Sequence, residues 1–172
     1  MNPSSVRQLS EADAAEYAEL RLAALRDAPT AFGSSYEEER LVTPATWRSR
    51  IAGGLQQATF GGYVDGGLAG LCTVVREQKL KQRHKAYLYS VYVAPEQRGR
   101  GLARQLIEAA IAYARSLEGV RQLLLTVTDG NLQAQKLYAG LGFMTYGREP
   151  DSLIVDGRPY AEILMCKSLV SY

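Results

Sequence analysis

The stretch 86–115 constrains the fold more than any other part of the chain, because a Tyr- and Val-rich segment passes through glycines directly into a long amphipathic pattern. Pro95 ends the first segment, and from Leu102 to Arg115 the apolar side chains recur along one broad helical stripe. The pattern predicts a strand over 86–93 and a helix over 102–115 that packs on a sheet. Since glycines let a ligand approach the backbone and the first helical turn offers unpaired N–H groups, the junction between the two elements predicts an anion site.

The remaining segments predict further strands and helices. Apolar segments meet at the turn-forming residues Asp65-Gly66-Gly67 and Asp156-Gly157, which predict two hairpins. Strands are expected at 6–9, 58–64, 68–76, 86–93, 122–127, from 143, at 153–155 and at 159–169, and helices at 11–27, 43–51, 102–115 and 132–141. This order predicts an α/β fold of the mixed α+β type, with a mostly antiparallel central sheet flanked by helices. No repeat or low-complexity linker divides the chain, so residues 1–172 are expected to form a single domain.

Composition and charge narrow the classes of function. Twenty Lys and Arg against eighteen Asp and Glu leave a formal charge of +2, which gives no reason to expect a nucleic-acid partner. No window approaches the ~20 apolar residues of a membrane helix and no signal pattern is present, so we expect no membrane partner and a cytoplasmic location. Cys72 and Cys166 lie in apolar runs and are expected to be buried and reduced. With His84 as the only histidine, hydrolase triads and metal centres are disfavoured, and no metal is expected.

The glycine-containing turn carries the residues that narrow the type of anion site. It has neither the Gly-Lys-Ser/Thr of a P-loop nor the third glycine of a Rossmann fingerprint, since Arg104 stands in that place. Arg98, Gly101 and Ala103 instead match the pattern Arg/Gln-x-x-Gly-x-Gly/Ala, and the segment resembles motif A of the GNAT superfamily of N-acetyltransferases. The resemblance implies the GNAT fold and acetyl-CoA as cosubstrate, with its pyrophosphate on the loop amides and its pantetheine arm beside the preceding strand. The coenzyme-binding residues that it implies are Val91, Tyr92, Val93, Arg98, Gly99, Arg100, Gly101, Leu102 and Ala103.

A second motif lies farther along the chain. Asn131, Leu137 and Tyr138, followed by Gly142-Phe143, resemble motif B of the same family, Asn-x-x-Ala-x-x-Leu-Tyr-x-x-x-Gly-Phe. Asn131 opens an expected helix, so its amide is expected to cap that helix or to bind the pantetheine. The resemblance implies that Tyr138 lies near the coenzyme sulfur and acts as the general acid that protonates the leaving thiolate. A phenol with a pKa of ~10 carries its proton at neutral pH and can donate it, although a core tyrosine is the alternative interpretation.

The acceptor side is less well marked. Residues 22–36 resemble a segment near the first helices of many bacterial members, where this fold shapes the acceptor pocket. The candidates for acceptor contact are Phe32, Tyr36, Glu37, Glu38 and Tyr89. For the first four, the alternative interpretation is the surface of an acidic helix. The strand before the glycine turn holds no acid, so the catalytic base stays unassigned. A water chain that ends on Tyr87, Tyr89, Glu37 or Glu38 is one route for the proton.

Together these features predict an acetyl-CoA-dependent enzyme that transfers an acetyl group to a primary amine of a small molecule or protein, by direct attack in a ternary complex. A non-catalytic acyl-CoA binding or sensing module is the first alternative. The second is an interaction protein that places the basic run 76–85 on RNA or ribosomes, but that run lacks interleaved aromatic residues and is also typical of a solvated hairpin. The resemblance further implies carboxy-terminal strands that often take part in homodimers, and the identity of the amine stays open.

Overall fold

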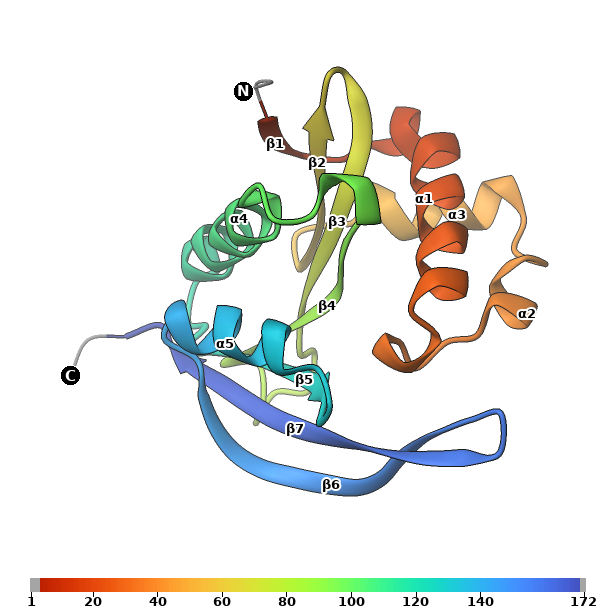
Figure 1. Ribbon diagram of the computed structural model, residues 1–172. Helices are drawn as coiled ribbons and strands as arrows, with labels where there is room; N and C mark the ends of the chain where they lie inside the picture. Colours follow the sequence, from red (N-terminus) through yellow and green to blue (C-terminus); the bar gives the residue numbers. More distant parts are fainter. Residues whose placement is uncertain (1–3, 171–172) are drawn as a thin grey trace.

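The computed structural model describes residues 4–170, which form a seven-stranded sheet with helices on both faces (Figure 1). The strands stand in the order β1-β2-β3-β4-β5-β7-β6, and every neighbouring pair is antiparallel except β4 and β5. Their bounds are β1 Ser4–Gln8, β2 Gln57–Val64, β3 Gly67–Arg76, β4 Lys85–Val93, β5 Gln122–Thr128, β6 Met144–Val155 and β7 Arg158–Ser168. The expected mixed α/β fold with a mostly antiparallel sheet is confirmed.

The helical segments connect the strands, and three of those described begin at a residue whose side chain caps the helix. The α-helices are α1 Ala14–Asp27, α2 Tyr36–Glu39, α3 Pro44–Ala52, α4 Leu102–Ser116 and α5 Leu132–Gly140, with 3₁₀ helices η1 Glu11–Asp13, η2 Pro29–Ala31 and η3 Pro95–Gln97. At the start of α3 the Thr46 amide donates a hydrogen bond to the Thr43 hydroxyl (3.2 Å), which satisfies one N–H of the first turn. None of the helices between residues 4 and 170 is long and apolar enough to cross a membrane.

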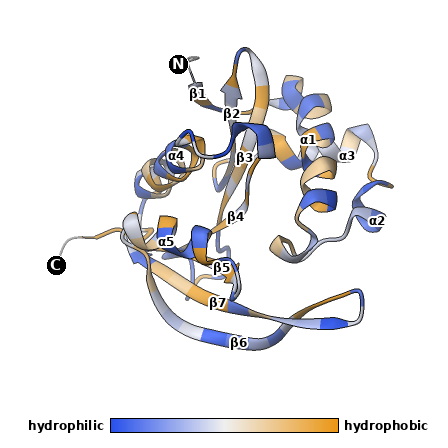
Figure 2. Ribbon diagram, in the orientation of Figure 1, coloured by the Kyte–Doolittle hydropathy of each residue, from blue (hydrophilic) through white to orange (hydrophobic). Residues whose placement is uncertain are grey.

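Helix α4 covers one face of the sheet, and α1 with α3 covers the other (Figure 1). The side chains of Leu106 and Ile107 on α4 are fully buried against β2, β3 and β4. On the opposite face, Leu71 of β3 packs with Tyr17 of α1 and Trp47 of α3. The central strand β3 is therefore apolar on both sides, whereas the edge strand β6 is more polar (Figure 2).

Strands β4 and β5 pair over a short length and then separate. Their register joins 85–87 to 122–124 only. A β-bulge contributes to the separation, because Cys72 of β3 faces two residues of β4, Ser90 and Val91, and Ser90 has a φ of 57°. The extra residue shifts the alternation of side chains, so that Tyr92 joins the cluster beneath α1 and Val93 joins the cluster beneath α4. The diverging ends of the two strands open a wedge in the sheet.

The β6–β7 hairpin differs from the expectation of two short strands before Asp156. Residues 144–155 form one long strand, β6, whose register with β7 is interrupted between Glu149 and Leu153. Three residues, 150–152, face the single residue Ala161 there, and Asp151 has a φ of 51°. Pro150 cannot donate a hydrogen bond to the ladder, which explains why the sequence pattern breaks although the strand continues.

The basic run 76–85 is mostly a solvated connection between β3 and β4. Residues 78–83 are exposed, as the solvated-hairpin interpretation predicts. Arg76 is an exception, because its side chain is buried and its guanidinium donates to the Gln56 side chain and to the carbonyls of Arg83 and Glu118. This arginine fastens the connection to the fold and is not part of a free basic surface.

Candidate active site

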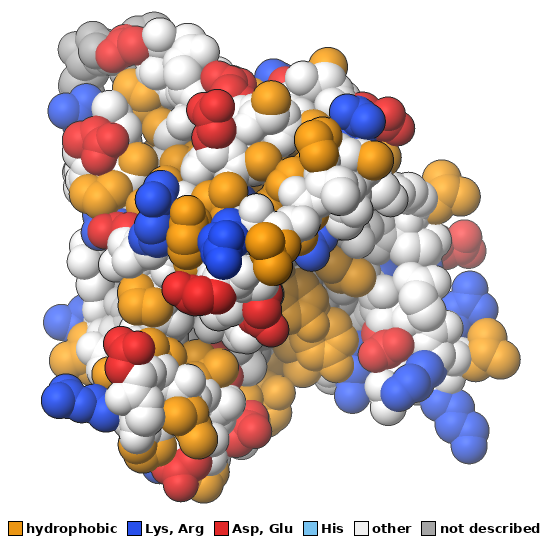
Figure 3. Space-filling view, turned by 90° about the vertical axis from the view of Figure 1, so that its right-hand side faces the viewer, with side chains coloured by type: hydrophobic (Ala, Val, Ile, Leu, Met, Phe, Trp, Pro, Cys, Tyr) orange, Lys and Arg blue, Asp and Glu red, His pale blue; other side chains and the backbone are white. Residues whose placement is uncertain are grey.

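The main cavity has a volume of about 870 Å³ and lies between the separated ends of β4 and β5. Figure 3 views the molecule from the side of α1 and α2 and shows it hollowed, with hydrophobic side chains at the bottom of the hollow. The predicted site residues that line the cavity are Phe32, Tyr89, Val91, Tyr92, Val93, Arg98, Gly99, Gly101, Leu102, Ala103, Asn131 and Tyr138. Two motifs that are far apart in the sequence therefore meet in one space.

The glycine turn presents bare backbone to the cavity. Gly99 and Gly101 have φ values of 76° and 83°, a region in which glycine is favoured over residues with a Cβ. A Cβ on either residue would meet no heavy atom within 4 Å, so both face open space. Gly101 is the N-cap of α4, and no side chain caps this helix. The unpaired N–H groups of its first turn are thus available to an anion such as a phosphate.

Arg98 is held by the protein next to this turn. Its Nε donates to the Val93 carbonyl (2.9 Å) and a terminal nitrogen donates to the carboxylate of Asp27, the last residue of α1. The Tyr92 hydroxyl donates to the same carboxylate (3.2 Å), and burial together with Asp27 raises the pKa of Tyr92 to about 12. Arg98 therefore ties α1 to the glycine turn. Arg100, which was also expected to contact the coenzyme, does not line the cavity.

Tyr138 projects from α5 into the same cavity. The residue is 6% exposed and its ring packs edge-on against Phe143, with 5.8 Å between ring centroids. Within residues 4–170, no group hydrogen-bonds to its hydroxyl, and that oxygen is not sealed from solvent, so it opens to the cavity. Burial raises the pKa of Tyr138 above the ordinary value for tyrosine, and the nearby Cys72 adds to the effect. The phenol keeps its proton and can present it to a bound molecule.

Asn131 caps the helix that carries Tyr138. Its side-chain oxygen accepts a hydrogen bond from the Ala134 amide (3.1 Å), as one of the two predicted roles requires. Asn131 also lines the cavity, and its side-chain nitrogen has no partner among the described residues. The residue can cap α5 and still offer an N–H group to a ligand.

A loop crosses one end of the cavity. The Thr128 hydroxyl of β5 donates to the Thr30 carbonyl of η2 (2.6 Å), which fastens residues 28–34 across the wedge. Phe32 of this loop packs against Tyr92, with 6.4 Å between ring centroids. Ala28, Ala31, Phe32, Gly33 and Ser34 line the cavity, so this loop forms part of its wall.

The predicted acceptor contacts divide into two groups. Phe32 and Tyr89 line the cavity, but Tyr36, Glu37 and Glu38 lie on α2 and do not. These three residues instead form the short acidic helix that was the alternative interpretation.

Local contacts account for the residues of α2. The Glu38 carboxylate accepts hydrogen bonds from the Ser35 amide (2.9 Å) and hydroxyl (2.8 Å), and these bonds lower the pKa of Glu38. This reciprocal arrangement is a capping box. The Arg26 guanidinium lies 4.8 Å from the centre of the Tyr36 ring. No ligand is needed to explain either side chain.

Three polar residues that the sequence did not single out also line the cavity: Arg21 of α1, Ser90 at the β4 bulge and Glu162 of β7. The Arg21 Nη1 donates to the Ser90 hydroxyl (3.2 Å). The Glu162 carboxylate accepts hydrogen bonds from Thr126 and Ser152. No local motif marks these residues, because only the packing of helix, bulge and hairpin brings them together.

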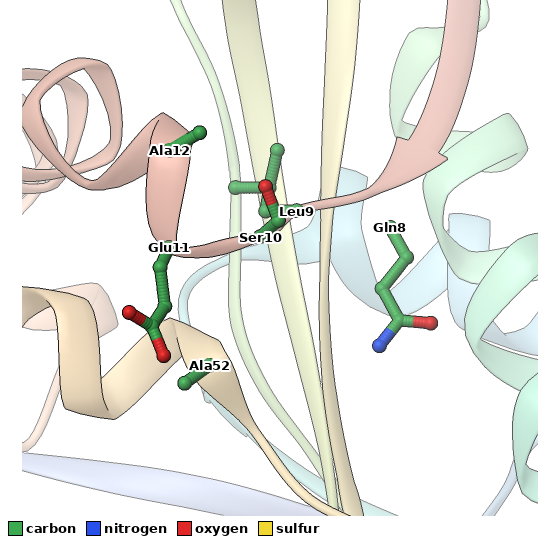
Figure 4. Close-up of a pocket in the computed structure, with 6 residues that line it drawn as sticks. All are labelled: Gln8, Leu9, Ser10, Glu11, Ala12 and Ala52. Atoms are coloured by element: carbon green, nitrogen blue, oxygen red, sulfur yellow. The ribbon is translucent and has the colours of Figure 1, made fainter.

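A second, shallower depression of about 560 Å³ lies where the chain leaves β1. It is lined by Gln8, Leu9, Ser10, Glu11, Ala12 and Ala52, and Glu11 is its one charged side chain (Figure 4). Residues 4–170 also contain no group of three or more His, Cys, Asp or Glu side chains that could hold a metal ion. The main cavity, by contrast, is lined by Tyr138, Asn131, Glu162 and three arginines.

Comparison with protein families identifies the family of this chain. Residues 18–143 match the model of the Acetyltransferase (GNAT) family. The chain belongs to this family. This is a family of acetyltransferases. The GNAT match includes the glycine turn, Asn131 and Tyr138, which meet in the main cavity.

Solved structures of other GNAT-type proteins share the fold. An acetyltransferase of the GNAT family from Streptococcus pneumoniae has a TM-score of 0.86 at 23% identity, over 96% of this chain and 99% of that one. An acetyltransferase from Salmonella typhimurium, solved with its cofactor acetyl-CoA, has a TM-score of 0.83 at 22% identity, over 99% and 96% of the two chains.

Curated relatives match over shorter stretches. A spermidine N(1)-acetyltransferase from Vibrio cholerae is 31% identical over 75 residues, 44% of this chain and 43% of the relative. An L-methionine sulfoximine/L-methionine sulfone acetyltransferase from Pseudomonas paraeruginosa is 39% identical over 62 residues, 36% of each chain. The chain thus spans less than half the length of these relatives. Their names refer to different amines.

Proposed function

We propose that this enzyme transfers the acetyl group of acetyl-CoA to a primary amine of a small molecule or protein, by direct attack within a ternary complex. The observation that carries the proposal is the continuity of the cavity, which joins the open N-terminus of α4 to the Tyr138 hydroxyl and to the end beneath Phe32. One space of this kind can hold both substrates at once. Relatives named for spermidine and for methionine sulfoximine support an amine as the acceptor.

The residues of the glycine turn would hold the coenzyme. The N–H groups that follow Gly101 are suited to its pyrophosphate, and the backbone of 91–93 runs unpaired with β5 along the cavity, where it can bond to the pantetheine arm. The Asn131 side-chain nitrogen is a further donor on the opposite wall. Arg98 would act mainly by fixing the turn through Asp27 and Val93, with one terminal nitrogen left for the phosphate.

Acetyl-CoA supplies an acetyl thioester, whose carbonyl carbon the amine attacks. The N–H groups of β4 near Val91 would polarise the carbonyl, and Tyr138 would give its proton to the departing sulfur. A covalent acyl-enzyme is not required. Cys72 is fully buried, its thiol donates to the Leu106 carbonyl (3.3 Å), and burial raises its pKa far above the usual range, which makes it a poor nucleophile.

We also propose that residues 1–172 act as a single acetyltransferase domain, since β1 and β6 stand at the two edges of the same sheet that contains the cavity.

The proposed function is tested by calorimetric titration with acetyl-CoA and free coenzyme A, followed by thiol release with a panel of amines. The panel should include spermidine, L-methionine sulfone and a peptide with a free N-terminus. Saturable binding and turnover with at least one amine is the expected result. Binding without turnover for any amine would favour the sensing module, and absence of binding would remove the role of the glycine turn.

A further inference from the structure

The charged side chains that line the main cavity differ in whether they have an ion-pair partner. Among the described residues they are Arg21, Arg98, Arg104 and Glu162. Each arginine has a carboxylate partner, namely Glu39, Asp27 and Glu108 respectively. Glu162 has no Lys or Arg nitrogen within ion-pair distance in residues 4–170. The cavity therefore holds one carboxylate whose charge no cation of the described chain neutralises.

Two hydroxyl groups fix the orientation of this carboxylate. Thr126 of β5 donates to Oε1 of Glu162 (3.1 Å), and Ser152 of β6 donates to Oε2 (2.7 Å). The strands that flank β7 on both sides thus hold one carboxylate between them. Each oxygen keeps further acceptor capacity, because a carboxylate has about four lone-pair sites and two are used.

The backbone is shaped to make one of these contacts. Ser152 is the last residue of the 150–152 bulge in β6, next to Asp151 with its positive φ. A bulge redirects the side chains that follow it, and here it brings the Ser152 hydroxyl to Glu162 and Leu153 to the cavity wall. The bulge at 150–152 therefore places one of the two hydroxyl groups that orient the Glu162 carboxylate.

We propose that Glu162 binds the acceptor's ammonium group and takes its proton before the attack on the thioester, an inference that rests on the proposed function. An amine acceptor reaches the enzyme mainly as a cation at neutral pH, and an unpaired carboxylate in a partly closed cavity attracts it. The two hydroxyl donors fix the orientation of the carboxylate and leave acceptor sites free on both oxygens, so that it can both position the nitrogen and receive a proton.

The ammonium loses one proton to Glu162, which passes it to solvent. The nitrogen lone pair forms the bond to the carbonyl carbon and the carbon–sulfur bond breaks, while Tyr138 protonates the sulfur. The nitrogen loses a second proton as the amide forms, and solvent returns that proton to Tyr138. The products are the amide, coenzyme A with a free thiol and one proton in solution.

The other candidate bases are less suited to this role. Glu37 and Glu38 lie on α2, outside the cavity lining. Tyr89 lines the cavity, but burial and the neighbouring Tyr87 raise its pKa, so it retains its proton and cannot accept another. Glu162 is the acidic side chain among the described lining residues.

The test compares Glu162→Gln with two other variants of the full chain. Glu162→Gln keeps the size of the side chain but removes its charge. Glu162→Asp keeps the charge on a shorter side chain, and Glu19→Gln makes the same change on an exposed position of α1 away from the cavity. The amine is the panel member with the highest turnover by the unmodified protein. Measurements are kcat and KM from pH 6 to 9, the Kd of acetyl-CoA, and calorimetric binding of that amine to protein saturated with free coenzyme A.

For Glu162→Gln we expect kcat/KM at pH 7 to fall about 100-fold, as for loss of a general base, with an unchanged Kd for acetyl-CoA and weaker amine binding. The deficit should shrink by about tenfold per pH unit toward the pKa of the amine, because the free amine then no longer needs a base. Glu162→Asp should recover part of the activity, and Glu19→Gln should match the unmodified protein.

A merely structural tether would give another result. Loss of thermal stability or of acetyl-CoA binding in Glu162→Gln, with a deficit in kcat/KM that does not vary with pH, would overturn the proposal. So would normal activity of this variant while the unmodified protein turns over the amine. If the unmodified protein binds acetyl-CoA but acetylates no amine, the proposed function itself fails, and the role of Glu162 fails with it.

Discussion

Arg21 of α1 and Glu39 of α2 form a bidentate ion pair inside the protein, with Nε–Oε2 and Nη2–Oε1 distances of 3.0 Å. Both side chains are less than a tenth exposed. The Arg21 guanidinium also contacts the Ser90 hydroxyl at the β4 bulge (3.2 Å) and lies 4.8 Å from the centre of the Phe32 ring. The pair therefore connects two helices to the bulge and to the loop 28–34, which lines the cavity.

We expect Glu39→Gln to lower the free energy of unfolding by about 3 kcal/mol, because Arg21 would stay buried without its counter-charge. The double change Arg21→Met and Glu39→Met should restore most of that loss, since no unpaired charge is then left inside. Urea unfolding of the single and double variants measures both effects. Equal destabilisation by Glu39→Gln and by an exposed control, Glu37→Gln, would show that the pair contributes little.

The same pair predicts a pH dependence of stability. Burial alone would raise the pKa of Glu39, but the hydrogen bond and charge of Arg21, aided by Arg50, outweigh it and lower the pKa below its ordinary value. A carboxylate with a lowered pKa in the folded state stabilises the protein above its unfolded pKa of about 4.3, and this contribution is lost as the pH falls through the lower folded value. Between pH 5 and 3 the unmodified protein should thus lose more stability than Glu39→Gln, which chemical unfolding at each pH would show.

The sequence predicted the elements that rest on local signals. Thr43-Pro44 and Asn131 begin helices because their side chains satisfy first-turn N–H groups, and Asp65-Gly66 turns a hairpin with two positive φ values. The full extent of β6 was missed, because its bulge at 150–152 interrupts the alternation that identifies a strand. The bulge at Ser90 left no signal either, since a serine in a Tyr- and Val-rich strand does not reveal a change of register.

The two motifs that meet in the main cavity were predictable for the same reason. Gly99 and Gly101 lie at a helix start, and Tyr138 lies two turns beyond the cap Asn131, so both motifs have a spacing that the sequence shows directly. Another part of the cavity lining comes from α1, β4 and β7, so that Arg21, Ser90 and Glu162 have no fixed separation in sequence. The acidic run after Tyr36 suggested an acceptor contact, but its Glu38 side chain is engaged by Ser35.

Gly101→Ala tests the glycine turn. The φ of 83° should cost about 1–2 kcal/mol for any residue with a Cβ. A phosphate seated on the turn would also meet the new methyl group, so we expect the Kd of acetyl-CoA to rise at least tenfold, about 1.4 kcal/mol. Gly101→Glu should abolish binding. Gly66→Ala is the matched control: its φ is 81° and it also faces open space, but it lies in the β2–β3 turn away from the cavity.

Gly66→Ala should lose stability to a degree similar to that of Gly101→Ala. Calorimetric titration should show that it binds acetyl-CoA normally. If Gly66→Ala weakens acetyl-CoA binding as much as Gly101→Ala does, the effect comes from backbone strain in general. Undiminished acetyl-CoA binding by Gly101→Glu would exclude the turn as the phosphate site.

Direct attack predicts that neither cysteine is needed. Cys72 is inaccessible with a strongly raised pKa, so iodoacetamide at pH 8 should modify native protein at the partly buried Cys166 first. Cys72→Ala should cost roughly 1 kcal/mol of stability through the lost sulfur contacts and leave kcat close to that of the unmodified protein. A fall in kcat of several orders of magnitude, or an acetylated cysteine detected by mass spectrometry during turnover, would point to an acyl-enzyme instead.

Tyr138→Phe isolates the proton that the sulfur receives. The change removes one oxygen that has no hydrogen-bond partner among the described residues, and it leaves the packing against Phe143 in place, so stability should hardly change. We expect kcat to fall about 100-fold, as for loss of a general acid, with an unaltered Kd for acetyl-CoA. Tyr113→Phe on α4, outside the cavity lining, is the control for the same chemical change.

The pH profile distinguishes a proton donor from a packing residue. Because burial raises the pKa of Tyr138 above the ordinary ~10, its proton is retained through the whole range in which the enzyme can be assayed. The unmodified protein should then show no loss of kcat from this group below about pH 10, and Tyr138→Phe should be slow at every pH. A descending limb near pH 8 that disappears in Tyr138→Phe would mean that the phenol ionises easily, contrary to its buried position. If Tyr138→Phe changes only KM, Tyr138 contributes to the pocket wall by packing alone, and solvent protonates the sulfur.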